Sequence, residues 1–167
     1  IESIKNELNN TEFVFNGDPS FTRAHLRRML QNLKQQGITA IAGDIQLNIG
    51  RFNGYNWSNG QVWNDQGVCY ATQASALIIN GNCILGNLKR NTDSTNSNIA
   101  SVYIPSYQPV TITSTVEIIT KDQQQSQFCD LEVMRKNDNN YQLFGCITPS
   151  KKPLPLSFAV SDPISYF

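Results

Sequence analysis

Charge and histidine are scarce in this sequence, and their scarcity argues against several functions. Charged side chains make up 16% of the 167 residues, and 13 lysines and arginines balance 13 aspartates and glutamates. Because nucleic-acid binding needs a concentrated basic surface, we expect no nucleic-acid partner. The single histidine, His25, and the lack of a Cys-x-x-Cys pair argue against a zinc site. A cysteine nucleophile would have His25 alone as its base.

Long apolar runs are also missing. The longest aliphatic run is Leu77-Ile78-Ile79, whereas a membrane-spanning helix needs about 20 apolar residues. The chain does not open with a basic segment and an apolar stretch, so we expect no signal peptide in it. With 40% hydrophobic residues, the chain can bury a core, and we expect it to fold.

Short motifs of known chemistry are absent as well. The sequence contains no phosphate-binding loop, dinucleotide fingerprint, His-Glu-x-x-His or Gly-x-Ser-x-Gly pattern, so we expect neither a cofactor nor a metal. Its carboxylates are scattered, without the paired spacing of a glycosidase. Ser94-Thr95-Asn96 matches Ser-x-Asn, one element of penicillin-recognising serine enzymes. Because it lies in a polar loop, we interpret this triplet as a product of composition.

The four cysteines form an even set, which favours two disulfides. Residues 128–135 and 141–147 read as strands on either side of the polar turn KNDNN. If the turn is centred on Asn137-Asp138, residue 135 faces residue 140 and Cys129 faces Cys146. Opposed Cα atoms in an antiparallel pair lie about 4.5–5.5 Å apart, a separation that a disulfide can span.

The other pair, Cys69 and Cys83, follows by elimination, although four cysteines formally allow three connectivities. Disulfides persist in oxidising compartments, so we expect the protein to reside in one.

The first half of the chain predicts an α+β fold in which a helix packs on a sheet. Thr22 is a suitable N-cap, and Gly37 can adopt the left-handed conformation that ends a helix. Apolar residues recur at helical spacing between them, at Leu26, Met29, Leu30 and Leu33. Alternating apolar residues predict strands on both sides of the helix, at Phe13 and Phe15 and at Ile45, Leu47 and Ile49.

A loop rich in Asn, Gly and aromatic residues follows at 51–66. Its aromatic side chains, which include Trp57 and Trp63, have two interpretations. They stack on sugar rings, as in a free-standing glycan-binding module, or they anchor the loop on the core of a structural domain.

A change of composition marks a domain boundary in the second half. NTDSTNSN at 91–98 is polar and of low complexity, and the residues after it are rich in β-branched side chains. A Pro-rich connector, TPSKKPLPLS, separates the predicted hairpin from another short strand, FAV. We therefore predict an all-β subdomain at 90–148, inserted into an α+β domain formed by residues 1–89 and 149–167.

Five stretches, taken in order, point to one family. They are GDPSFTRAHLRRMLQNLKQQGITAIAGDIQL, VWNDQGVCYATQASALIINGNC, YQPVTITSTVEI, FCDLEVM and FGCITPSKKPLPLSFAVSDPISY. Together they resemble the serine D-Ala-D-Ala carboxypeptidases of peptidase family S13, in particular the penicillin-binding protein 4 type. The resemblance covers essentially the whole chain with both cysteine pairs, and it implies a periplasmic protein of a Gram-negative bacterium.

The resemblance falls on a part of these enzymes that lacks the catalytic groups. Members use the serine of a Ser-x-x-Lys motif, completed by Ser-x-Asn and Lys-Thr-Gly. Here no serine is followed by a lysine three residues later, and no Lys-Thr-Gly or Lys-Ser-Gly occurs. The family pattern implies a non-catalytic insert between the first two motifs of a longer polypeptide. Its partners would be the catalytic domain of that polypeptide and, through it, the peptidoglycan stem peptide.

One position is implied to reach the substrate. In relatives, an aspartate before the Asn-Cys close and an aromatic after the cysteine contact the charged end of the diaminopimelate side chain. Asn80 and Ile84 stand in these places here. A neutral amide cannot make a charge-assisted bond to an ammonium group. Either this protein binds a different peptide through Asn80, or another residue supplies the charge; the other interpretation of Asn80 is a turn residue in INGN. We interpret residues 68–83 as a wall braced by a Cys69–Cys83 bridge.

Overall fold

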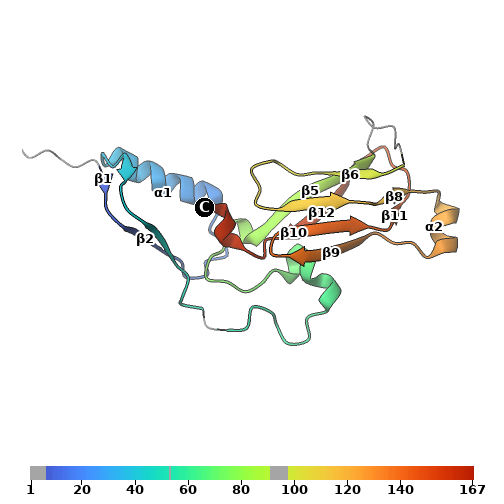
Figure 1. Ribbon diagram of the computed structural model, residues 1–167, viewed down its shortest axis with the longest axis horizontal. Coiled ribbons are helices and arrows are strands. Elements are labelled where there is room, and N and C mark those ends of the chain that lie inside the picture. The colour runs from blue at the N-terminus through green and yellow to red at the C-terminus, as the bar shows by residue number, and fades with distance from the viewer. Residues whose placement is uncertain (1–6, 53, 91–97) are drawn as a thin grey trace, which may run out of the picture. The chain divides into compact units, whose positions relative to one another are not determined.

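The computed structural model describes residues 7–52, 54–90 and 98–167 (Figure 1). The chain divides into two compact units. Unit 1 comprises residues 1–56 and 74–81, and unit 2 comprises residues 57–73 and 82–167.

Unit 1 consists of a helix and two short pairs of parallel strands. Its elements are β1 (Glu7–Leu8), β2 (Thr11–Val14), α1 (Arg23–Gln35), β3 (Ala40–Ile41) and β4 (Ile45–Asn48). β1 pairs with β3, and β2 pairs with β4. The register shifts by one residue between the two pairs, where the Asp44 N–H donates to Asn10 Oδ1 at 3.0 Å. Parallel strands need a crossover connection, and α1 lies in the one that joins β2 to β4.

The predicted helix is confirmed at both ends. The Thr22 Oγ1 accepts the His25 N–H at 3.3 Å, and His25 Nδ1 accepts the Thr22 N–H at 3.2 Å, so the pair closes a capping box. Gly37, which follows the C-cap, has a φ of +87°. The expected burial is wrong, because α1 has no buried residue and Ile45 on β4 is 55% exposed.

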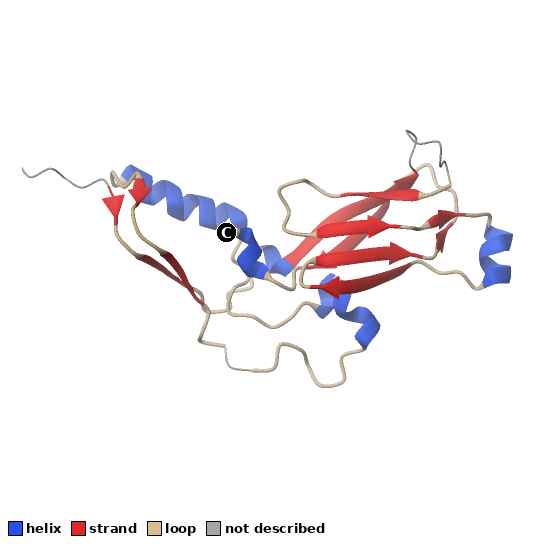
Figure 2. Ribbon diagram, viewed as in Figure 1, coloured by secondary structure: helices blue, strands red, loops and turns tan. Residues whose placement is uncertain are grey.

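Unit 2 is built mainly of strands (Figure 2). They are β5 (Cys83–Arg90), β6 (Ala100–Tyr103), β7 (Thr111–Ser114), β8 (Glu117–Ile118), β9 (Glu132–Asn137), β10 (Asn140–Phe144), β11 (Cys146–Ile147) and β12 (Leu154–Ala159). Two three-stranded sheets have the orders β12-β5-β6 and β7-β10-β9, and β11 pairs with β8. The helical segments are η1 (Trp63–Gly67), η2 (Cys69–Ala71), α2 (Lys121–Gln127) and η4 (Pro163–Tyr166).

The hydrophobic core of unit 2 joins its two larger sheets. Leu88 from β5 and Phe158 from β12 belong to the same buried cluster as Tyr141 and Leu143 from β10. The Tyr141 hydroxyl donates to the Ala159 carbonyl at 2.6 Å, which gives this buried polar group a partner. Burial raises the pKa of the Tyr141 hydroxyl, so the group stays protonated and remains a donor at neutral pH.

The bounds of the two units differ from those of the two predicted domains. The prediction placed residues 1–89 and 149–167 in one domain and residues 90–148 in the other. β12 pairs along its whole length with residues 83–88 of β5, and β5 also pairs with β6. These antiparallel ladders tie residues on both sides of the polar stretch into one sheet. Most of that stretch, including Ser94 and Asn96, lies outside the described residues.

The predicted hairpin is confirmed, but its register is wrong by one residue. Arg135 pairs with Tyr141, and the two-residue turn is Asp138-Asn139, with a φ of +32° at Asp138. The first strand also begins later than predicted, at Glu132, because α2 ends only at Gln127. Helix α2 was not predicted, although its capping box can be read in the sequence: Thr120 is the N-cap and Gln123 lies at N3.

Candidate functional site

Asn80, the predicted substrate-binding residue, lies beside the N-terminus of α1. Its N–H donates to the Phe21 carbonyl at 3.0 Å, and its Oδ1 accepts the N–H of Arg23, the first residue of the helix, at 3.2 Å. Asn80 has a φ of +53°, a conformation that asparagine tolerates better than most residues. The side chain is exposed, so it can meet solvent or a ligand while it holds the helix.

The contact with Arg23 gives Asn80 a structural role. The first N–H groups of a helix have no partner within the helix, and the helix dipole places partial positive charge there. Asn80 satisfies one of these donors from a distant part of the sequence. A carboxylate at this position would interact with the same donor and with the dipole, so this site favours an acidic residue electrostatically.

Two substitutions of Asn80 distinguish the contribution of its side chain to the stability of α1 from that of its backbone conformation. Asn80→Gly keeps the positive φ and removes the amide, so we expect a loss of about 0.5–1 kcal/mol in the stability of α1. Asn80→Asp is expected to stabilise α1 by about 0.3–1 kcal/mol at neutral pH, because the carboxylate faces the helix N-terminus. Amide exchange of residues 24–35 measures both changes. Equal exchange in all three proteins would show that the Arg23 contact adds no stability.

Both predicted disulfides are present. Cys69 and Cys83 have Cα atoms 5.1 Å apart, and Cys129 and Cys146 have Cα atoms 5.4 Å apart. All four cysteines lie in the described residues and take part in these two bridges, so none of them is a thiol in the oxidised protein.

The bridge Cys69–Cys83 lies at the base of the segment that carries Asn80. The chain leaves unit 2 after Gln73, contributes residues 74–81 to unit 1 and re-enters unit 2 at Asn82. The bridge therefore joins the outgoing and the returning chain. On the returning side, the Asn82 carbonyl accepts the Val160 N–H at 2.7 Å.

The two tryptophans of the 51–66 loop have different environments. Trp57 is half-buried, and the Arg135 guanidinium lies 5.5 Å from its ring centroid, a cation–π arrangement that fits an anchor. Trp63 on η1 is 76% exposed and lines a hollow of about 360 Å³ with the side chains of Arg135 and Phe144. The anchor interpretation fits Trp57, whereas Trp63 presents its ring to solvent.

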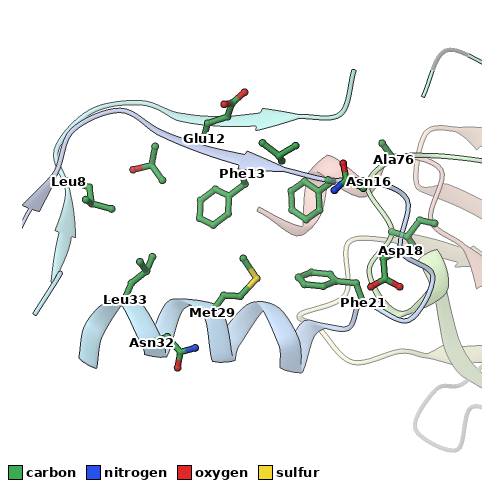
Figure 3. A pocket seen from close by; sticks show the side chains of 14 residues that line it. Leu8, Glu12, Phe13, Asn16, Asp18, Phe21, Met29, Asn32, Leu33 and Ala76 are labelled. Atoms are coloured by element: carbon green, nitrogen blue, oxygen red, sulfur yellow. The ribbon is translucent and has the colours of Figure 1, made fainter. Parts of the chain in front are cut away.

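A larger apolar hollow of about 510 Å³ lies in unit 1, between β2 and α1. Phe13 points from β2, and Met29 and Leu33 point from α1, into the same space (Figure 3). Glu12 points away from the helix (Figure 3). The sequence predicted the two apolar faces but not the gap between them, because periodicity shows which face is apolar and not what covers it.

No group of three His, Cys, Asp or Glu side chains that could hold a metal ion occurs in the part of the chain that the structure describes. Within those residues, no helix is long and apolar enough to cross a membrane. Among the described residues that line these two hollows there is no serine.

Comparison with known proteins assigns the chain to a family. The model of the D-Ala-D-Ala carboxypeptidase 3 (S13) family matches residues 3–167. The chain belongs to the S13 family. It is 33% identical over 152 residues to D-alanyl-D-alanine carboxypeptidase DacB of Haemophilus influenzae, a match that covers 91% of this chain and 31% of DacB.

Two solved structures are similar to this chain over nearly its whole length. The crystal structure of penicillin-binding protein 4 (dacB) from Haemophilus influenzae superposes with a TM-score of 0.85 and 31% identity, over 99% of this chain and 36% of that one. The structure of the same protein with a β-lactam superposes with a TM-score of 0.71 and 28% identity, over 99% of this chain and 33% of that one. The chain thus spans about one third of the length of these S13 relatives.

Proposed function

We propose that residues 1–167 are a non-catalytic part of a serine D-Ala-D-Ala carboxypeptidase and endopeptidase that acts on peptidoglycan stem peptides. The observation that supports this most is the family match over 3–167 in a sequence without Ser-x-x-Lys or Lys-Thr-Gly. The catalytic serine would lie in the rest of the parent polypeptide. There it would attack the penultimate D-Ala carbonyl, and water would then hydrolyse the acyl-enzyme.

The two disulfides support a place for the parent in the periplasm, where the bridges Cys69–Cys83 and Cys129–Cys146 would be stable. In the parent, this chain would shape the substrate cleft. Asn80 is its candidate contact with the stem peptide. Because Oδ1 of Asn80 already accepts the Arg23 N–H, a ligand would meet mainly the amide group as a donor, which suits a carboxylate or carbonyl better than an ammonium group.

Labelling with a fluorescent penicillin tests the proposal directly. We expect no covalent label on the 167-residue chain, because no serine in it has the lysine of a Ser-x-x-Lys motif, and stoichiometric label on the parent polypeptide. The control is the parent with its Ser-x-x-Lys serine replaced by alanine, which should lose the label. A labelled 167-residue chain, or an unlabelled parent, would contradict the proposal.

A glycan-binding module without enzymatic activity is the second candidate, and the exposure of Trp63 favours it. Trp63 offers an exposed indole face on which a sugar ring can stack. The guanidinium of Arg135, which lies over Trp57 and lines the same hollow, can donate hydrogen bonds to the sugar. This candidate requires that Trp63→Ala abolish binding of the chain to purified glycan strands, while Tyr103→Ala, a change at another exposed aromatic residue, leaves it intact.

A further inference from the structure

The strand pair β2–β4 in unit 1 has open edges. Thr11 and Phe15 donate their N–H groups across to Asp44 and Asn48, at 2.9 and 3.0 Å. In a parallel ladder, alternate residues bond to the same neighbour, so the N–H and C=O of Glu12 and Val14 point to the opposite edge. In the described part of the chain, β2 has no strand partner other than β4.

A two-stranded parallel pair of this kind is incomplete as a sheet. Parallel sheets in proteins are covered on both faces, and a two-stranded ribbon is marginally stable alone. Here β2 and β4 have α1 beside them, yet α1 has no buried residue and Met29 is 43% exposed. The apolar side chains of the helix therefore lack part of the surface that would cover them.

Of the two paired strands, only β2 lines the hollow that lies between β2 and α1. Six consecutive residues, 11–16, line it, and no residue of β4 does. The space thus runs along the strand direction, beside backbone groups that can bond to an extended chain. Met29 and Leu33 form its apolar opposite wall (Figure 3). A compact apolar ligand would fill the space but form no bonds with the edge N–H groups, whereas an extended segment would do both.

We propose that an extended segment of the parent polypeptide, from outside residues 1–167, adds to the edge of β2 as a third strand. Alternate apolar side chains of this segment would pack over Met29 and Leu33 and close the hollow. This inference rests on the proposed function, because this chain matches only 31% of DacB and the remaining length would supply the segment. A segment of the same polypeptide also meets the edge at a high effective concentration.

Amide hydrogen exchange in the 167-residue chain and in the parent tests the added strand. We expect the amides of Glu12 and Val14 to exchange at least about a hundredfold more slowly in the parent, since they would gain hydrogen bonds only there. Amides of β5 and β10 should exchange alike in both proteins. Equal exchange at Glu12 and Val14 in the two proteins would overturn the proposal, and so would protection in the isolated chain that rises with its concentration, since that indicates a second copy.

Two matched proline substitutions distinguish the edges. Val14→Pro removes the outward N–H of β2, and Ile45→Pro removes the outward N–H of β4; both residues are exposed, at 45% and 55%. In the parent, we expect Val14→Pro to abolish the slow exchange at Glu12 and Ile45→Pro to retain it. Loss with both variants, or with neither, would contradict strand addition at β2. Penicillin labelling of the parent reports on the proposed function separately.

Discussion

Gly145→Ala is expected to destabilise the protein by about 2–5 kcal/mol. Gly145 separates β10 from β11 and has a φ of +87°, a conformation that costs any residue with a Cβ about 1 kcal/mol or more. An added Cβ would also clash with the Asp130 carbonyl oxygen. Because that oxygen belongs to the backbone, the clash requires a backbone shift, which adds about 1–3 kcal/mol.

Gly60→Ala provides a matched control for Gly145→Ala. Gly60 has a nearly identical φ of +84°, but nothing lies within 4 Å of the position that its Cβ would take. We expect a loss of about 1 kcal/mol there, from the backbone conformation alone. Urea unfolding of both variants measures the difference. Equal losses would show that the space around Gly145 relaxes without cost.

Removal of the Cys129–Cys146 bridge is expected to cost about 3 kcal/mol in the chain-entropy model. The two cysteines are 17 residues apart, and Cys146 is buried. We expect the double variant C129A/C146A to unfold at lower urea than the oxidised protein. The bridge Cys69–Cys83 closes a similar loop of 14 residues, so C69A/C83A should lose a similar amount.

Reductant provides the control for both disulfide variants. In the unmodified protein the reductant should break two bridges, and in each variant it should break one. The loss of stability should therefore be larger in the unmodified protein. Titration of the denatured, unreduced protein should find no thiol. A midpoint that reductant does not change in the unmodified protein would show that the bridges constrain neither the folded nor the unfolded chain.

Local signals in the sequence predicted the elements best. The N-cap Thr22, the glycine at 37 and the apolar spacing between them define α1 correctly, because capping and periodicity act within a few residues. The pair Cys129–Cys146 was predicted from a hairpin whose register was wrong by one residue, and Cys69–Cys83 followed by elimination. Gly145 explains this outcome: its left-handed conformation lies between β10 and Cys146, outside the regular ladder, so the bridge does not depend on strand register.

Long-range pairing was not readable from the same signals. The bounds of the two units depend on the pairing of β5 with β12, which lies about 70 residues later in the chain. The residue pattern of each strand does not indicate which other strand pairs with it. The Arg23 contact of Asn80 likewise joins residues 57 positions apart. Trp63 and Trp57 have similar sequence surroundings, yet only the folded chain distinguishes the exposed ring from the anchored one.

The interleaving of the two units affects how the protein is made. Residues 1–56 cannot complete their unit until residues 74–81 have left the ribosome, and β5 cannot pair with β12 until β12 has been synthesised. The order of synthesis therefore keeps strand edges exposed for a long stretch of translation, when pairing with neighbouring chains is a hazard. Chaperone binding during synthesis would be most useful in that interval.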